Sequence, residues 1–137
     1  MKNTCNSYDL FFKKEGLDFG KTEKIVNESL RKADDGDLYL EFKQSESYVY
    51  DDKKIKNAST STDKGFGLRS VKDETSAYSH SSDISVTNIK NAGKIVQSIL
   101  SSSSKSKIID PIRTNKKHYS NLNPMNGFSP EQKTKLL

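Results

Sequence analysis

Short polar turns separate the extended segments in the middle of this chain, and this spacing constrains the fold more than any other sequence feature. From Asp37, apolar and polar residues alternate, which places the two sets on opposite faces of a strand. Four extended segments follow one another, and they cover residues 37–50, 55–62, 68–71 and 76–80. Because parallel pairing needs a long crossover connection, short turns allow only antiparallel neighbours. The sequence therefore predicts a curved antiparallel four-stranded meander.

A helical pattern lies on each side of these strands. Residues 21–34 place apolar side chains along one stripe, and Asp18 can cap the start of this helix. We expect the helix to stop at residues 34–36, where Gly36 can adopt a left-handed backbone. Ser82-Asp83 can cap a second helix, whose apolar positions are Val86, Ile89, Ala92, Gly93, Val96, Ile99 and Leu100. Two amphipathic helices can cover one apolar face of a sheet, so the expected fold class is α+β.

The chain divides into three regions. Residues 1–100 form the expected α+β domain, and residues 101–128 are a Ser- and Lys-rich linker without a sustained hydrophobic period, which predicts a flexible C-terminal tail. In residues 129–137, Ser129 can cap a helix that has Pro130 in its first position and Gln132 at the capping-box position. Because nucleation costs more than a helix of barely two turns returns, we expect this helix to be interrupted.

The positive net charge is confined to the C-terminal region. Residues 1–100 hold 16 Lys and Arg against 16 Asp and Glu, whereas residues 101–137 hold 7 against 2. A nucleic-acid-binding fold usually concentrates basic residues on one folded face. Nucleic acid is therefore an unlikely partner, and weak binding through residues 105–135 remains an alternative.

Cysteine content and hydropathy indicate the cellular compartment of the protein. Cys5 is the only cysteine, which excludes an internal disulfide and a thiolate zinc cluster and fits a reducing cytosol. The sequence contains neither the apolar core of a signal peptide nor an apolar run long enough to span a bilayer. We therefore expect a soluble, cytoplasmic protein without membrane contact.

The sequence offers no complete catalytic, cofactor-binding or metal-binding set. A zinc hydrolase needs two histidines on one helix face with a glutamate beside them, but neither His80 nor His118 is followed by Glu. We interpret both as solvated side chains. Cys5 lies near the N-terminus without an adjacent base, so a nucleophilic role is not expected.

Three weaker patterns have structural interpretations. Gly65 and Gly67 lack the third glycine of a nucleotide-binding loop, and they favour a bend or bulge in a strand. The acidic pairs at residues 34–35 and 51–52 are typical of polar turns. Exposed tyrosines leave two readings open, partner binding or cross-strand packing; they are Tyr39, Tyr48 and Tyr50.

The order helix, strands, helix resembles the N-terminal domain of the TldD/PmbA family, closer to its TldD branch. The most specific stretch runs from residue 37 to residue 83. It contains an aspartate-led strand, Ser-Glu-Ser, an acidic turn, a Gly-x-Gly-x-Arg strand and an Ala-Tyr strand; these positions are Asp37, Ser45, Glu46, Ser47, Gly65, Gly67, Arg69, Ala77 and Tyr78. The opening DLFFKKEGLDF and the closing HYSNLNPMNGFSPEQKTKLL are also similar to the family.

This resemblance implies a role in peptide hydrolysis without a catalytic site of its own. Members of the family are soluble bacterial zinc peptidases that act on unfolded or leader peptides, and TldD-type subunits work with a PmbA-type partner around an enclosed cavity. An HExxxH helix and a cysteine of the C-terminal domain hold the zinc, and no residue here matches them. The resemblance therefore implies a truncated, substrate-enclosing and dimer-forming N-terminal domain that is inactive alone. Zinc would enter only with a TldD-like C-terminal fragment or a PmbA-like subunit. The alternative is a free-standing protein-binding module.

Overall fold

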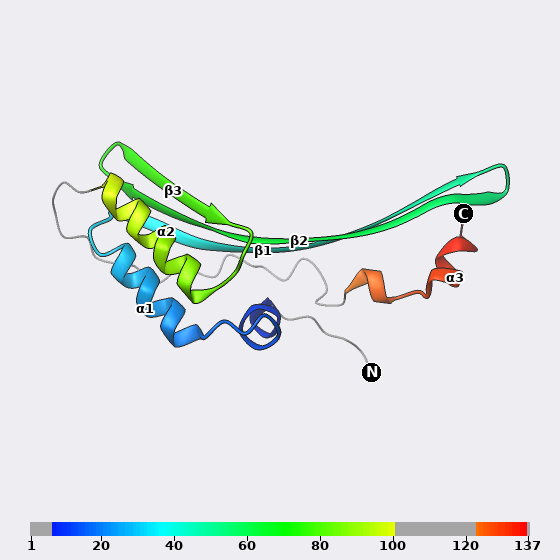
Figure 1. The fold of residues 1–137 in the computed structure, drawn as a ribbon, viewed down its shortest axis with the longest axis horizontal. Coiled ribbons are helices and arrows are strands. Elements are labelled where there is room, and N and C mark those ends of the chain that lie inside the picture. The colour runs from blue at the N-terminus through cyan, green and yellow to red at the C-terminus, as the bar shows by residue number, and fades with distance from the viewer. Residues whose placement is uncertain (1–6, 101–122, 137) are drawn as a thin grey trace.

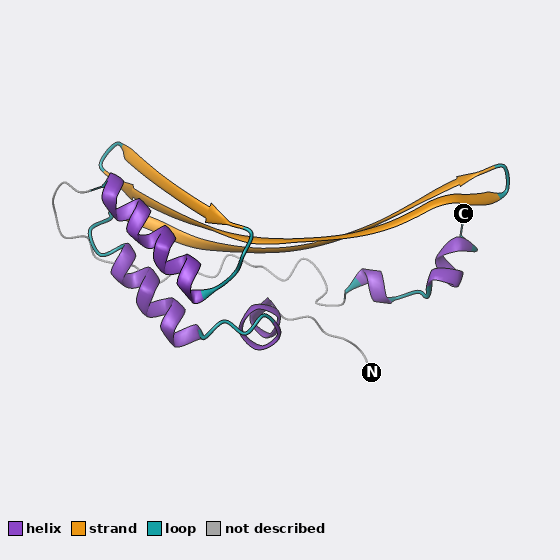
Figure 2. Ribbon diagram, viewed as in Figure 1, coloured by secondary structure: helices purple, strands orange, loops and turns teal. Residues whose placement is uncertain are grey.

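The computed structural model describes residues 7–100 and 123–136, and its centre is a three-stranded antiparallel sheet with two helices on one face (Figures 1 and 2). The expected α+β class is confirmed. The elements in chain order are the π-helix η1 (Asp9–Lys14), α1 (Phe19–Ser29), β1 (Asp35–Asp51), β2 (Lys54–Lys72), β3 (Thr75–Ser81), α2 (Val86–Ile99), the 3-10 helix η2 (Pro124–Asn126) and α3 (Pro130–Thr134).

The expectation of four strands is wrong, because β2 is one strand of 19 residues. Residues 63–67 remain extended and pair with residues 39–43 of β1 without interruption. The register shifts instead between Val49 and Tyr50. A Cβ on Gly65 would lie 2.9 Å from the carbonyl oxygen of Ser81 in β3, and a Cβ on Gly67 would collide with the ring of Tyr78. These glycines therefore permit a close approach of β3 and are not needed for a turn.

The hairpin of β1 and β2 has a buried half and a projecting half. Leu38, Leu40 and Phe42 are half-buried while their neighbours Tyr39 and Glu41 are exposed, as the alternation predicts. The other half extends beyond β3 and the helices (Figure 1), and every residue from position 51 to position 64 is exposed. Its turn contains Asp52 and Lys53 in the left-handed region, with φ of 48° and 57°, which matches the polar turn expected there.

The core lies between α2 and the neighbouring strands β2 and β3. Leu68 of β2 is fully buried together with Ile89 and Val96 of α2, and α1 packs against α2. The two helices approach closely where Gly93 faces Ser29. A Cβ on Gly93 would collide with the Ser29 hydroxyl. The tightest helix contact therefore depends on the absence of a side chain at residue 93.

Both helices have boundaries that differ from the expected ones. Asp18 caps α1 by accepting a hydrogen bond from the backbone N of Lys21 at 2.9 Å, and this bond holds the pKa of the Asp18 carboxyl below its usual value. The helix ends at Ser29, ahead of the expected residues 34–36. Gly36 lies in β1 and not in a left-handed cap. A Cβ at this position would lie 2.7 Å from the carbonyl oxygen of Arg69, so the close approach of the chain requires a glycine.

The cap of α2 is also displaced from the expected Ser82-Asp83. Ser85 is the N-cap, and its hydroxyl accepts a hydrogen bond from the backbone N of Asn88 at 3.2 Å. The Asp83 carboxylate instead accepts a bond from the Asn88 side chain at 2.7 Å. Two polar side chains therefore fix the start of this helix.

The C-terminal residues 123–136 contact β1, although the sequence favours a flexible tail. The predicted cap of α3 is confirmed, because the Ser129 N–H donates to Gln132 Oε1 at 2.9 Å and the Gln132 N–H donates to Ser129 Oγ at 3.3 Å. Lys133 Nζ lies 2.5 Å from Glu46 Oε2 and donates to the carbonyl oxygen of Met125 at 2.6 Å. Residues 101–122, which make up most of the predicted linker, lie outside the described residues.

None of the helices within residues 7–100 and 123–136 combines the length and the apolar character that a membrane crossing requires.

We predict that Leu68→Ala lowers the free energy of unfolding by about 2–5 kcal/mol, because it removes buried methyl groups and leaves a cavity under α2. Denaturant unfolding followed by circular dichroism measures this loss. The control is Ile95→Ala on α2, where the side chain is 49% exposed and the change should stay within about 0.5 kcal/mol. Equal losses in the two variants would contradict this position of the core.

We also predict that the Lys133–Glu46 pair holds residues 123–136 on the hairpin. The two side chains are only 17% and 21% exposed, so Lys133→Met and Glu46→Gln should each speed amide exchange in α3 about fivefold, and the double variant no further. The exposed Lys135→Met is the control. Exchange rates that stay unchanged in all three variants would show that the pair holds nothing.

Candidate functional site

The described residues do not assemble the ligands of a metal centre. Within residues 7–100 and 123–136 no group of three or more His, Cys, Asp or Glu could hold a metal ion. His118 and Cys5 lie outside the described residues, and His80 lies on β3 beside an aromatic ring. This part of the chain therefore does not fit the zinc centre of a peptidase.

A shallow groove of about 270 Å³ crosses the sheet, and side chains of all three strands line it. Its lining includes Tyr39, Glu41, Asp63, Gly65, Tyr78 and His80. Tyr39 and Glu41 alternate with the half-buried Leu38 and Leu40, so they project from the face opposite the helices. We call this hollow the open-face groove.

Aromatic rings form two walls of the open-face groove. Tyr39 on β1 is 58% exposed and Tyr78 on β3 is 59% exposed. The Tyr78 ring stacks on His80 with ring centroids 5.7 Å apart, and it occupies the space above Gly67 that a side chain would otherwise fill. The two rings therefore present large faces to solvent on either side of β2.

Carboxylates lie beside these rings. The Tyr39 hydroxyl donates a hydrogen bond to Glu41 Oε2 at 3.0 Å. This bond, together with the negative charge of Glu41, raises the pKa of the Tyr39 phenol above its usual value. Asp63 lies opposite Lys43 in the strand register, but no ion pair in the described part of the chain reaches Asp63 or Glu41.

Two cations near the groove form ion pairs with other carboxylates. Arg69 Nη2 lies 3.0 Å from Asp35 Oδ2 and 2.6 Å from Asp37 Oδ1, and the hydrogen bond to Asp37 raises the pKa of Arg69. Lys64 Nζ lies 2.6 Å from Glu15 Oε2, a residue that follows η1. The groove therefore holds two carboxylates, Glu41 and Asp63, with Lys64 in its lining and Lys43 opposite Asp63 in the register.

The sequence alone did not indicate this groove as a unit. Gly65, Tyr39 and His80 have separate interpretations in the sequence and Asp63 has none, because strand order was needed to bring these residues together. The signal that could have found the groove is the Gly-x-Gly spacing, which removes two successive side chains from one face of a strand. Antiparallel pairing then places Tyr39 opposite Gly67 and Glu41 opposite Gly65.

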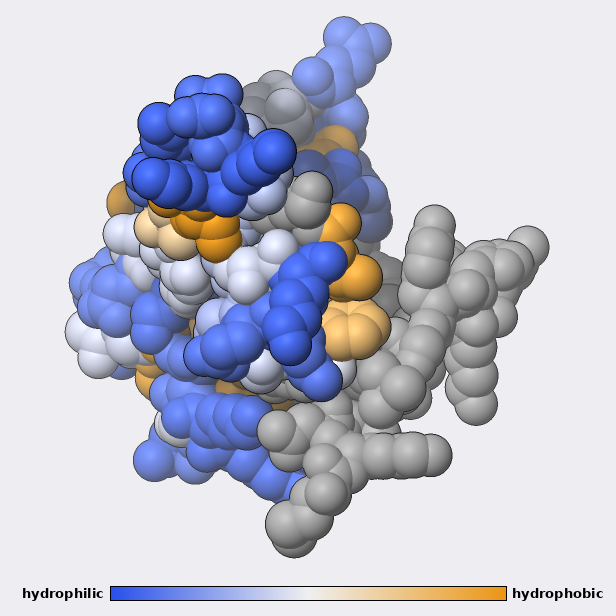
Figure 3. Space-filling view, turned by 90° about the vertical axis from the view of Figure 1, so that its right-hand side faces the viewer, coloured by the Kyte–Doolittle hydropathy of each residue, from blue (hydrophilic) through white to orange (hydrophobic). Residues whose placement is uncertain are grey.

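The other tyrosines and the acidic pairs have separate positions. Tyr48 is half-buried opposite Ala58, and Tyr50 is exposed opposite Ile55 near the hairpin turn. Seen from the hairpin end, hydrophobic residues form small patches between hydrophilic ones (Figure 3). The prediction that residues 34–35 form one polar turn is wrong. Asp34 accepts a bond from the Asp73 N–H at 2.7 Å, whereas Asp35 begins β1.

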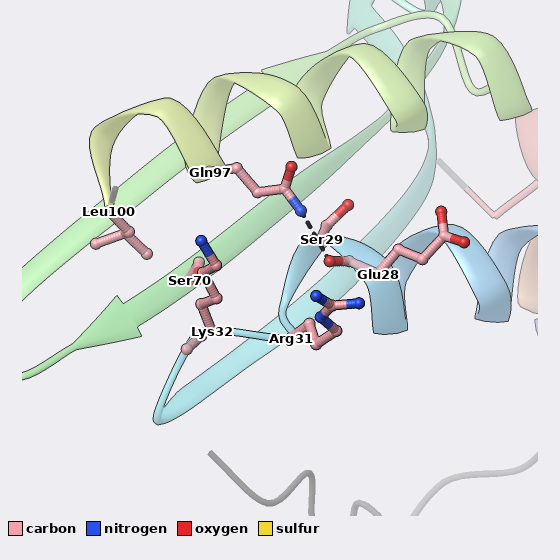
Figure 4. Close-up of a pocket in the computed structure, with 8 residues that line it drawn as sticks. Glu28, Ser29, Arg31, Lys32, Ser70, Gln97 and Leu100 are labelled. Atoms are coloured by element: carbon pink, nitrogen blue, oxygen red, sulfur yellow. Dashed lines mark hydrogen bonds between the residues drawn. The ribbon is translucent and has the colours of Figure 1, made fainter. Parts of the chain in front are cut away.

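A second cavity of about 360 Å³ lies where the C-terminal ends of α1 and α2 meet β2 (Figure 4). Ser70 at its wall is 1% exposed, and its hydroxyl lacks a hydrogen-bond partner within the described ranges. Gln97 spans the two helices by donating to the carbonyl oxygen of Glu28 at 2.8 Å. A serine at the buried position after Phe66 and Leu68 was the sequence signal for this cavity.

Comparison with known proteins gives a consistent assignment. A family model described as PmbA/TldA metallopeptidase domain 1 matches residues 36–101. The "Metalloprotease TldD homolog" of Buchnera aphidicola subsp. Acyrthosiphon pisum is 31% identical over 137 residues, which cover 98% of this chain and 26% of that protein. The homologue of Haemophilus influenzae is 30% identical over 116 residues, which cover 80% of this chain and 23% of that protein. The chain spans about a quarter of the length of the curated relatives it matches.

We predict that Glu41→Gln lowers the pKa of the Tyr39 phenol towards its ordinary value. Ionisation of Tyr39 beside a carboxylate is opposed by repulsion and by loss of the donated hydrogen bond, and glutamine removes the repulsion. A pH titration of the tyrosine ring signals by NMR measures the shift. Asp51→Asn at the hairpin turn is the charge-matched control, and an equal shift there would contradict a local effect.

Proposed function

This chain belongs to the TldD/PmbA metallopeptidase family, and we propose that it supplies a non-catalytic domain that encloses the peptide substrate and contacts other parts of the enzyme. Zinc and its ligands would come from a TldD-like C-terminal fragment or a PmbA-like subunit. The substrates would be unfolded or leader peptides, and the single cysteine favours action in the cytosol.

The projecting half of the β1–β2 hairpin carries this proposal. Two strands alone are marginally stable in water, and here residues 51–64 extend from the body with every side chain exposed. Three large apolar side chains near the turn are 38–48% exposed; they are Val49, Tyr50 and Ile55. A second protein surface that covers these residues would stabilise the projecting strands, which supports a role in assembly.

Unpaired strand edges support the substrate-enclosing part of the proposal. Among the described residues, the strand order β1-β2-β3 leaves one edge of β1 and one edge of β3 without a strand partner. The pairing of β2 with β3 covers only residues 66–72 of β2. The part of β2 that precedes Phe66 therefore also lacks a β3 partner. An extended peptide can add to such edges through backbone hydrogen bonds, without any requirement for a particular sequence.

A free-standing protein-binding module is the second candidate. The open-face groove favours it, because exposed tyrosines with carboxylates beside them are typical of recognition surfaces. The two candidates differ in their partners: the first requires a metallopeptidase fragment or subunit, and the second requires none.

The purified chain should neither bind zinc tightly nor cleave a casein or leader-peptide substrate. Mixing it with a purified TldD-like C-terminal fragment or PmbA-like subunit should give a complex of defined mass and chelator-sensitive cleavage. The measurements are zinc titration, light scattering and peptide mass spectrometry. Stoichiometric zinc binding by the chain alone, or no association with either partner, would overturn the proposed function.

A matched pair of variants tests the hairpin. Ile55→Ser removes an apolar side chain from the projecting end, and Ile95→Ser removes one of comparable exposure from α2. The first should weaken the complex about tenfold, as loss of a contact at the centre of an interface does, and the second should not. Equal effects would show that the hairpin does not mediate assembly.

A further inference from the structure

We infer that the open-face groove is a binding site for the guanidinium group of an arginine side chain in a partner polypeptide. This inference concerns recognition by the chain itself, and it goes beyond the proposed function because it names the residue type that the domain selects.

The floor of the groove leaves room for a foreign side chain. Along β2, residues 69, 67, 65 and 63 project from the open face, and the two central ones are glycines. The Tyr78 ring already occupies the space above Gly67. The backbone of Ser81 approaches Gly65, where a Cβ would lie 2.9 Å from the Ser81 carbonyl oxygen, and the hollow of about 270 Å³ lies beside this contact, lined by Tyr39, Glu41 and Asp63. This hollow is open to solvent and matches one long side chain better than a large ligand.

Charge determines which side chain fits. Glu41 and Asp63 both line the hollow, and neither belongs to an ion pair within the described residues. A positive group between them would relieve their repulsion and could donate hydrogen bonds to both carboxylates. Lys43 faces Asp63 across the strands without forming an ion pair, and Lys64 is held by Glu15 at 2.6 Å. Neither lysine therefore forms an ion pair with Glu41 or Asp63 in the part of the chain that the structure describes.

The aromatic walls favour a guanidinium over an ammonium. Tyr39 and Tyr78 expose more than half of their surfaces, and the Tyr78–His80 stack gives one wall a planar surface. A guanidinium stacks on an aromatic plane while its edge donates to carboxylates, whereas an ammonium is a compact, strongly hydrated charge. A long apolar stem would also cover the exposed ring faces.

The same sheet face contains an arginine in such surroundings. Arg69, two residues beyond Gly67, lies between Asp35 at 3.0 Å and Asp37 at 2.6 Å. Tyr78 lies opposite Arg69 in the register. The groove at Gly65 repeats this arrangement of two carboxylates and a tyrosine, but the arginine is missing. An arginine from another chain would complete it.

The test uses the full chain labelled with ¹⁵N and a peptide of serine and threonine residues around one central arginine. Its partner probe carries citrulline, which keeps the shape and removes the charge. The arginine peptide should shift the amide signals of Gly65, Gly67, Tyr39 and Tyr78. The citrulline peptide should bind at least about fivefold more weakly, since it loses the charge-dependent contacts.

The protein-side variant is Glu41→Gln with Asp63→Asn, and the control is Asp51→Asn with Asp52→Asn at the hairpin turn, which removes the same charge outside the groove. The groove variant should lose about fivefold in affinity and the control should not. Equal binding of both peptides, equal losses in both variants, or shifts outside the groove would overturn the inference. Shifts at Gly65 that depend on chain concentration without peptide would assign the site to a second copy and also overturn it. Association with peptidase fragments tests the proposed function separately.

Discussion

The packing of α2 over Leu68 is the contact on which the rest of this structure depends. Leu68, Ile89 and Val96 are fully buried, and their burial commits one face of β2 to the helices. Because side chains alternate along a strand, the opposite face of the same residues must then face solvent. The positions of the open-face groove and of Arg69 with its two aspartates follow from this one commitment. The helices α1 and α2 lie against the part of the hairpin next to β3, so the remaining part projects beyond these two helices (Figure 1).

The glycines of β2 link this packing to recognition. On the helix face, β2 presents Phe66 and Leu68 to the core, and on the open face it presents Gly65 and Gly67. The missing side chains let β3 approach and let the Tyr78 ring lie across the sheet. The result is a hollow with aromatic walls and two carboxylates that form no ion pair within the described residues. The chemistry proposed for it is recognition of a cation.

The chain belongs to the TldD/PmbA family, whose curated members are longer than this chain. The chain spans about a quarter of the length of its curated relatives, and the described residues hold no metal-ligand cluster. In the proposed function, the strand edges would offer backbone hydrogen bonds, the projecting hairpin would offer apolar burial and the groove would offer charge. The Lys133–Glu46 pair adds an internal contact that joins residues 123–136 to the hairpin.

Local patterns in the sequence determined the secondary structure and its class. The alternation from Asp37, the caps at Asp18 and Ser129, and the polar turn at residues 51–52 depend only on neighbouring residues, so they could be predicted from the sequence. Features that depend on contacts between residues far apart in the sequence were decided only by the tertiary structure. The uninterrupted β2 depends on β3, the strand position of Gly36 depends on Leu30, and the cap at Ser85 depends on α2. The open-face groove also required strand order, because Glu41 and Asp63 lie far apart in the sequence and meet only through the register of β1 on β2.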